Sequence, residues 1–138
     1  MRSKGYGMKI TIVVDAPPIF SALLGGAARR LFFDARFRFL TTDFTLGEVE
    51  KYIPFIAQRS GRSEASIRRA LGLLPLQRFG EMDYQQMRSK AEALIGERDP
   101  KDVDILALAL AKHAILWTED KHFEGISEIS LVHTRDLL

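Results

Sequence analysis

The chain contains no cysteine, which excludes disulfide bonds, thiol nucleophiles and zinc sites built on thiolates. Long apolar runs are also missing. The uncharged run Ile10 to Val14 ends at Asp15, far short of the roughly 20 residues that a membrane helix needs. We therefore expect no signal peptide and no membrane span, and we expect a cytoplasmic location. Neither sign of charge is in large excess, because 20 Lys and Arg face 18 Asp and Glu.

The composition is that of one globular domain. Of the 138 residues, 46% are apolar and 28% are charged, and a chain of this length buries enough surface to fold without a disulfide or a structural metal. Residues 1–7 are polar and contain two glycines, so we expect a disordered leader there. A single domain is predicted over residues 8–138.

Segments typical of strands and of helices alternate along the chain. Residues 9–14 are β-branched and almost wholly apolar, which favours a strand covered on both faces. The alternation predicts an α/β fold with a mainly parallel sheet. The predicted strands are 9–14, 37–41, 76–79, 115–117 and 129–132; the predicted helices are 17–24, 27–35, 43–58, 64–73, 84–95 and 100–114, with Thr134 capping a last turn.

Two helix starts have recognisable sequence patterns. Thr45 and Glu48 have the spacing of a capping box. Asp99 before Pro100 is typical of an N-cap residue followed by proline at the first helical position. The helix that follows is apolar almost all round, so we expect it in the core, and Asp104 interrupts its interior.

Four acids are placed where a parallel sheet gathers its ligands. Asp15 directly follows the first strand, and Asp120 lies three residues past the strand 115–117. Asp102 is in the first turn of the apolar helix and Glu48 is early in another. Ligands bind beyond the carboxyl ends of parallel strands, and crossover helices start again at that edge. We therefore expect these four carboxylates to converge.

Converging carboxylates cannot all stay ionised unless a cation compensates them. A ligand set made only of oxygen atoms favours Mg²⁺ or Mn²⁺ over zinc or copper, and Asp104 is a further candidate ligand. Each acid also has a purely structural explanation: Asp15 and Asp120 as turn residues, Asp102 as a partner of the helix dipole, and Glu48 as part of the capping box.

Four blocks of the chain resemble, in order, the PIN-domain family. They are VVDAPPIFSALL, TTDFTLGEVEKY, DPKDVDILALALAKHAILWTEDKHF and LVHTRDLL. The resemblance covers nearly the whole chain from Met8, and its most specific part is residues 99–123. The chain is similar to the single-domain archaeal and bacterial branch that includes the VapC-type toxins of toxin–antitoxin pairs.

The resemblance implies a three-layer α/β/α fold and a ribonuclease that depends on Mg²⁺ or Mn²⁺. It places the catalytic, metal-holding acids at Asp15, Glu48, Asp102 and Asp120, with Thr118 orienting the last acid. Glu50 competes with Glu48 for its place, although helical spacing directs it to another face.

One residue departs from the family pattern. Members commonly have a small polar residue two places after the first Asp, whereas this chain has Pro17. Proline offers neither an N–H group nor a side-chain hydrogen bond, so this departure predicts weakened or altered activity.

The resemblance also implies partners: single-stranded or looped RNA, an antitoxin protein and a second copy of the chain. Tyr52, Ile53, Phe55 and Ile56 supply either a dimer interface or core. Phe44, Tyr52, Phe55 and Phe123 either stack on bases or are buried. The candidate contacts to the RNA backbone are Arg29, Arg30, Lys51, Arg68, Arg69 and Lys121, although arginine clusters are often only solvated helix faces.

Three other functions remain in competition. An aspartyl-nucleophile phosphatase needs an acid two residues after Asp15, where Pro17 stands, and a receiver domain needs an acidic pair beside the first strand. A catalytically silent PIN-like module that binds RNA or protein is the third, and Pro17 favours it. We interpret His113, His122 and His133 as surface or packing residues rather than ligands.

Overall fold

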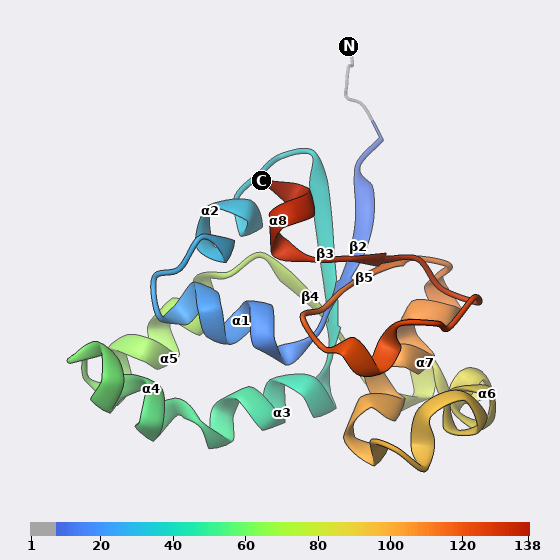
Figure 1. Cartoon of the computed structure of the whole chain (residues 1–138). Coiled ribbons are helices and arrows are strands. Elements are labelled where there is room, and N and C mark those ends of the chain that lie inside the picture. The colour runs from blue at the N-terminus through green and yellow to red at the C-terminus, as the bar shows by residue number, and fades with distance from the viewer. Residues whose placement is uncertain (1–7) are drawn as a thin grey trace.

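Five parallel strands form the central sheet of the computed structural model, which describes residues 8–138 (Figure 1). The predicted leader, residues 1–7, lies outside the described residues. The strands are ordered β4-β3-β2-β5-β6, and all four neighbouring pairs are parallel. The predicted parallel sheet is therefore confirmed. The strand bounds are β2 Ile10–Val14, β3 Phe37–Thr42, β4 Leu76–Phe79, β5 Ile115–Trp117 and β6 Leu131–Val132.

Helices cover both faces of this sheet, so the predicted three-layer α/β/α fold is confirmed (Figure 1). Side chains of β2 alternate between the layers, because successive residues of a strand point to opposite faces. Ile12 and Val14 belong to one buried cluster and Val13 to the other. The first cluster lies under α1 Ala16–Leu23, α2 Ala28–Phe32, α3 Asp43–Lys51, α4 Ile53–Ser60, α5 Glu64–Leu73 and α8 Thr134–Leu137; the second lies under α6 Arg88–Ala91 and α7 Val103–Lys112.

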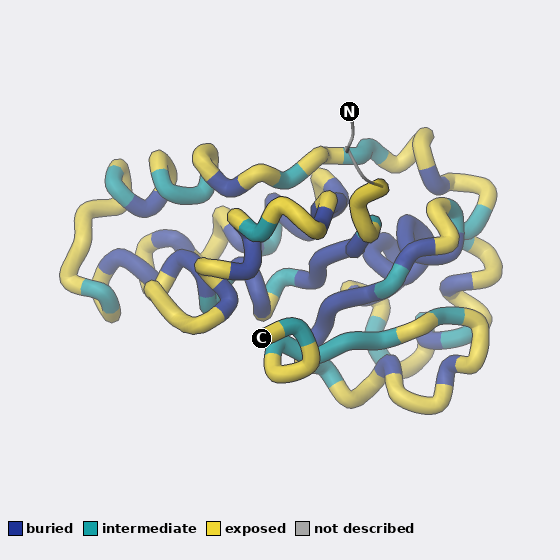
Figure 2. The backbone as a smooth tube through the Cα atoms, turned by 90° about the horizontal axis from the view of Figure 1, so that it is seen from above, coloured by how far each residue is buried: buried dark blue, intermediate teal, exposed yellow. Residues whose placement is uncertain are grey.

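The helix predicted to lie in the core does so. Every residue of α7 from Val103 to Leu110 is buried, in accord with its apolar character on all sides. Figure 2 shows buried segments through the middle of the molecule and exposed ones around its outside. No helix within residues 8–138 combines the length and the apolar character needed to cross a membrane.

The predicted helix 43–58 is wrong as a single element. It is two helices, α3 and α4, which meet at Tyr52. Pro54 explains the break, because proline lacks the N–H group that a continuous helix uses and its ring clashes with the preceding turn. The capping box is also wrong: the Thr42 hydroxyl, not that of Thr45, caps α3 by accepting the Thr45 N–H at 2.9 Å. Glu48 is therefore free for another role.

The predicted helix 84–95 is helical over most of its length, but it is not one α-helix. The chain forms 3₁₀ turns over Glu81–Asp83 and Gln85–Met87, then α6, then a π-helical turn over Glu92–Gly96. Tyr84 is 1% exposed and lies between the two 3₁₀ turns. Its hydroxyl donates to Asp104 in α7, a distant contact that propensity does not reveal.

Several predicted ends are also shifted. α2 and β6 are shorter than predicted, and α7 ends at Lys112 because His113 is left-handed with φ 50°. The turn at Pro100–Asp102 is 3₁₀ and precedes α7. His133, not Thr134, is the N-cap residue of α8, since the Thr134 hydroxyl accepts the Trp117 indole N–H at 3.1 Å.

Candidate functional site

The four acids predicted to converge line one hollow at the carboxyl edge of the sheet. Asp15 caps α1 directly after β2, Asp102 precedes α7, Asp120 follows β5, and Glu48 comes from α3. The hollow has a volume of about 210 Å³. Its lining residues are Asp15, Ala16, Pro17, Phe20, Phe44, Thr45, Glu48, Tyr52, Asp99, Lys101, Asp102 and Asp120.

Thr118 connects two of these acids. Its hydroxyl donates to Asp15 Oδ2 at 2.8 Å, and its oxygen accepts the backbone N–H of Asp120 at 2.9 Å. The other oxygen of Asp15 accepts the Ala16 N–H at 2.9 Å. Burial raises the pKa of Asp15 above its ordinary value, and the hydrogen bond from Thr118 opposes that rise. Thr118 thus lies where it can orient both carboxylates.

Asp102 is the least compensated acid of the site. It is only 8% exposed, and its Oδ2 atom has no hydrogen-bond partner among the described residues. Burial, the charge of Asp15 and the neighbouring Asp99 raise the pKa of Asp102 to about 9. A buried oxygen without a partner is unusual in a folded protein. A bound divalent cation would satisfy this atom and stabilise the ionised form, so the residues present fit a metal ion.

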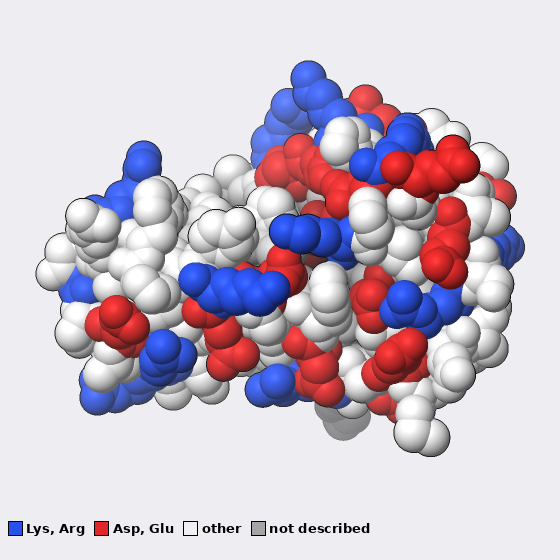
Figure 3. All heavy atoms as spheres, turned by 90° about the horizontal axis from the view of Figure 1, so that it is seen from below, with Lys and Arg blue, Asp and Glu red and all other residues white. Residues whose placement is uncertain are grey.

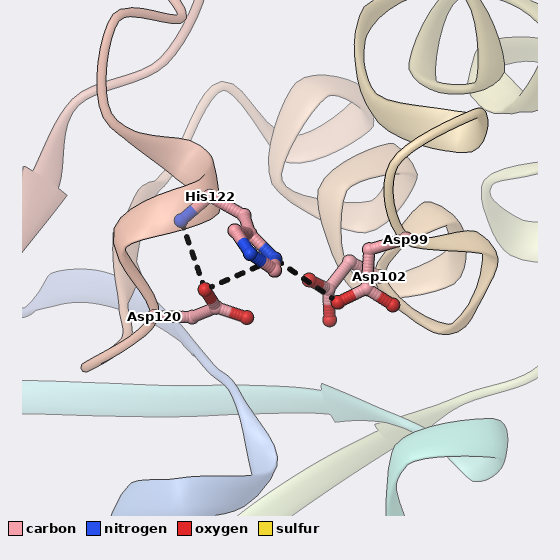
Figure 4. Close-up of side chains that lie close together, drawn as sticks. All are labelled: Asp99, Asp102, Asp120 and His122. Atoms are coloured by element: carbon pink, nitrogen blue, oxygen red, sulfur yellow. Dashed lines mark hydrogen bonds and ion pairs between the residues drawn. The ribbon is translucent and has the colours of Figure 1, made fainter.

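Two further side chains complete the acidic cluster, and sequence reasoning missed both. Asp99, Asp102, Asp120 and His122 each offer one ligand atom, and these four atoms lie within 4.8 Å of one another (Figure 4). His122 Nδ1 lies 3.3 Å from Asp99 Oδ2 and 3.4 Å from Asp120 Oδ1. His122 is exposed at the surface, as predicted, but the expectation that it lies away from the acids is wrong.

Asp99 is the N-cap residue of the 3₁₀ turn Pro100–Asp102, as predicted, but its side chain makes no capping hydrogen bond. It extends toward His122 instead (Figure 4). An acid before proline is typical of a helix start whether its carboxylate caps the helix or not. The available sequence signal was the spacing: Asp99 is three residues before Asp102, and His122 is two residues after Asp120.

Glu48 lies in the same hollow but beside two cations. Its Oε2 accepts a hydrogen bond from Lys51 Nζ at 2.7 Å, and its Oε1 lies 3.6 Å from Lys101 Nζ. The bond from Lys51 lowers the pKa of Glu48, which is therefore ionised at neutral pH. Glu50 lines a different hollow, together with Ile53 and other residues, as its helical spacing predicted. Lys101 is a site residue that sequence reasoning did not single out.

Asp104 does not join the acids. Its Oδ1 lies 2.8 Å from Arg88 Nη1, and the other oxygen accepts the Tyr84 hydroxyl. It is absent from the lining of the acidic hollow. Two residues along a helix point in different directions, so Asp104 faces away from the side chain of Asp102 and ties α6 to α7.

The cationic residues, which are the predicted contacts together with Lys101, divide into near and distant ones. Lys51 and Lys101 adjoin the acids, and Figure 3 shows Lys and Arg atoms directly beside acidic atoms in the middle of this face. Arg29 and Arg69 line a separate hollow formed by α1, α2 and α5. Arg30 is on α2, Arg68 pairs with Glu64 at 3.6 Å, and Lys121 is exposed next to Asp120.

The aromatic and apolar candidates divide in the same way. Phe44 and Tyr52 line the acidic hollow and are 40% and 49% exposed. Phe55 is exposed outside that lining, and Phe123 is buried in the core, so Phe123 is not available to a base. Ile53 and Ile56 are core as well, which leaves Tyr52 and Phe55 as the exposed part of the predicted dimer surface.

We expect the metal-free protein to lose stability as the pH rises from about 5 to about 9, because of Asp102. Its pKa is about 9 in the folded protein against an ordinary 3.8, so the folded state binds this proton more tightly than the unfolded state does. Deprotonation therefore disfavours folding across that window. Asp102→Asn removes the titrating group and flattens the slope. Thermal unfolding of both proteins in EDTA measures stability at each pH in this range. Equal slopes of stability against pH in the two proteins would show that Asp102 titrates normally.

Comparison with known proteins identifies the fold and the family. The family model described as PIN domain matches residues 13–137. The DNA-bound VapBC structure from Salmonella typhimurium superposes with a TM-score of 0.67 at 16% identity, covering 92% of this chain and 99% of that one. A toxin-antitoxin complex from Klebsiella pneumoniae gives 0.65 at 19% identity, with 89% and 97% covered. No curated protein matches the chain in sequence.

Proposed function

Because the chain belongs to the PIN-domain family, we propose that it is an endoribonuclease that uses Mg²⁺ or Mn²⁺ at its acidic hollow to hydrolyse RNA phosphodiester bonds. The observation that carries the proposal is the buried Asp102 carboxyl group. Its Oδ2 atom has no hydrogen-bond partner in the described part of the chain, and the group faces the charges of Asp15, Asp99 and Asp120. Carboxylates this close together repel one another, and a bound divalent cation would neutralise their charge.

Asp15, Asp102 and Asp120 are the residues that would hold the metal. When bound, a divalent cation lowers the pKa of a water molecule and stabilises the charge that grows on a phosphoryl group. The protein contributes orientation: Thr118 fixes the Asp15 side chain and the backbone of Asp120 with one hydroxyl group. Glu48, held by Lys51 at 2.7 Å, is placed to position an attacking water by hydrogen bonding.

RNA with unpaired bases fits the surroundings of the acids. Lys51 and Lys101 bring positive charge next to the carboxylates, where a phosphate group must approach. Phe44 and Tyr52 offer partly exposed aromatic rings in the same hollow, and base stacking on such rings is tolerant of sequence. The hollow of 210 Å³ is small, so it accommodates a short single-stranded segment better than a duplex.

We further propose that the protein is the toxin of a toxin–antitoxin pair and acts in the cytoplasm. The Klebsiella pneumoniae structure of the same fold is a toxin-antitoxin complex, and the match covers 89% of this chain. An antitoxin protein would restrain the nuclease by covering the acidic hollow. The exposed rings of Tyr52 and Phe55 at the start of α4 are available to a second copy of the chain.

The test is cleavage of end-labelled, unstructured RNA. We expect cleavage products with added Mg²⁺ or Mn²⁺, none in excess EDTA, and recovered activity when the metal is restored. Gel analysis of the products measures the rate, and circular dichroism verifies that the metal-free protein is still folded. Folded protein that cleaves no RNA with either metal would instead support the silent PIN-like module, which the presence of Pro17 in the wall of the hollow favours.

A further inference from the structure

Within residues 8–138, Asp99, Asp102, Asp120 and His122 form a group whose ligand atoms all lie within 4.8 Å of one another, and this group includes a ring nitrogen. His122 lies in the 3₁₀ turn Lys121–Phe123, directly after Asp120. Its backbone N–H donates to Asp120 Oδ1 at 2.8 Å, which holds the turn against the acid. The imidazole reaches across toward Asp99 on the opposite side of the cluster (Figure 4).

We propose that His122 is a nitrogen ligand of the metal centre and that it makes the site prefer a transition-metal cation, with Mn²⁺ as the probe, over Mg²⁺. This inference rests on the proposed metal-dependent function and deepens it. The four acids predicted from the sequence supply oxygen atoms alone, which do not favour Mn²⁺ strongly over Mg²⁺. His122 changes the chemistry of that set.

The geometry suits a single cation. Metal–ligand distances near 2.0–2.2 Å place the ligand atoms of one ion roughly 3–4 Å apart. His122 Nδ1 lies 3.3 Å from Asp99 Oδ2 and 3.4 Å from Asp120 Oδ1. Asp102 completes the group, with all four ligand atoms within 4.8 Å of one another.

A second observation points independently to a ligand at this place. Asp102 is 8% exposed, and its Oδ2 atom has no hydrogen-bond partner within residues 8–138. The buried side chain therefore has an oxygen left over, beside the three other ligand groups. Ion pairs of His122 with Asp99 and Asp120 leave Asp102 Oδ2 without a partner. A cation shared by all four side chains would satisfy that oxygen.

Imidazole discriminates between the two metals. Mg²⁺ takes oxygen ligands in near-ideal octahedral geometry and keeps several waters. Nitrogen ligands instead favour the first-row transition metals, with affinity that rises along the series from Mn²⁺. The presence of one ring nitrogen among three carboxylates therefore raises the affinity for Mn²⁺ relative to that for Mg²⁺.

The test is direct metal binding by the full chain, with His122→Gln as the variant and His113→Asn as the control. The His122 side chain is 53% exposed, so its replacement removes little buried surface. His113 is a histidine far from the cluster at the end of α7, and its left-handed φ of 50° suits Asn. Electron paramagnetic resonance of free Mn²⁺ measures the Kd of the protein for Mn²⁺. Competition between Mn²⁺ and added Mg²⁺ measures the Kd for Mg²⁺.

We expect the native protein to bind Mn²⁺ more tightly than Mg²⁺. His122→Gln should weaken Mn²⁺ binding about tenfold or more and leave the Kd for Mg²⁺ nearly unchanged, and the control should behave like the native protein. Electron spin-echo modulation should detect coupling of bound Mn²⁺ to a ring ¹⁴N nucleus in the native protein. The variant should lack that coupling.

Two results overturn the inference in different ways. Mn²⁺ bound without ¹⁴N coupling in the native protein, and with equal Kd in the variant, shows that His122 is only an ion-pair partner of the acids; RNA cleavage then stands. A native protein that binds neither metal overturns both the role of His122 and the proposed nuclease. The native ¹⁴N spectrum decides the matter even if the variant does not fold.

Discussion

Asp120→Asn is expected to slow metal-dependent RNA cleavage by about 100-fold or more, a loss comparable to that of one preorganised charge-stabilising group. Asp120 belongs both to the acidic hollow and to the group of four metal-ligand candidates. The amide is a poorer ligand for a hard cation than the carboxylate. Initial cleavage rates in saturating Mn²⁺ measure the effect.

The fold should survive this substitution. Asp120 adds to the negative charge that raises the pKa values of Asp15 and Asp102, so its neutralisation relieves repulsion in the metal-free protein. The amide oxygen can still accept the His122 backbone N–H. Glu124→Gln is the matched control, an exposed acid in the same segment but outside the hollow. Full activity in Asp120→Asn would remove Asp120 from the metal centre.

Asp104→Ala should lower the free energy of unfolding by about 3 kcal/mol. Asp104 is 7% exposed, and it accepts the Tyr84 hydroxyl and pairs with Arg88 at 2.8 Å. Its removal leaves the buried Tyr84 hydroxyl without an acceptor, and it leaves Arg88, whose side chain is 31% exposed, without its closest partner. Urea-induced unfolding followed by circular dichroism measures the change.

The control for this prediction is Glu81→Gln, which affects the same arginine. Glu81 lies 3.5 Å from Arg88 and its side chain is 61% exposed, so its loss should cost at most about 0.5 kcal/mol. The Kd for Mn²⁺ should be unchanged in folded Asp104→Ala, because Asp104 does not line the hollow. An Asp104→Ala protein of native stability with weakened Mn²⁺ binding would make Asp104 a ligand instead.

Local sequence patterns predicted those strands and helices well whose formation depends on residues close in the sequence. The apolar, β-branched run of β2 requires cover on both faces, and α7 is buried as its composition demands. Ser63 caps α5 by accepting the Ser66 N–H at 3.1 Å, and serine is a common residue at that position. The predicted helix 43–58 is interrupted at Tyr52, and the helix predicted over 84–95 does not include Tyr84. Pro54 breaks the helix next to Tyr52. Tyr84 is buried because its hydroxyl donates to Asp104, which is distant in the sequence and lies in α7.

The sequence by itself determined that Asp15, Glu48, Asp102 and Asp120 meet at one edge, because parallel strands all end on the same side of their sheet. Only the tertiary structure decided the roles of Asp99, Asp104 and His122. An acid before proline or inside a helix has the same local pattern whether it caps, pairs or binds a ligand. The role of Asp99 depends on His122, 23 residues away, and that of Asp104 depends on Tyr84, 20 residues away. Such contacts form only when the layers pack together.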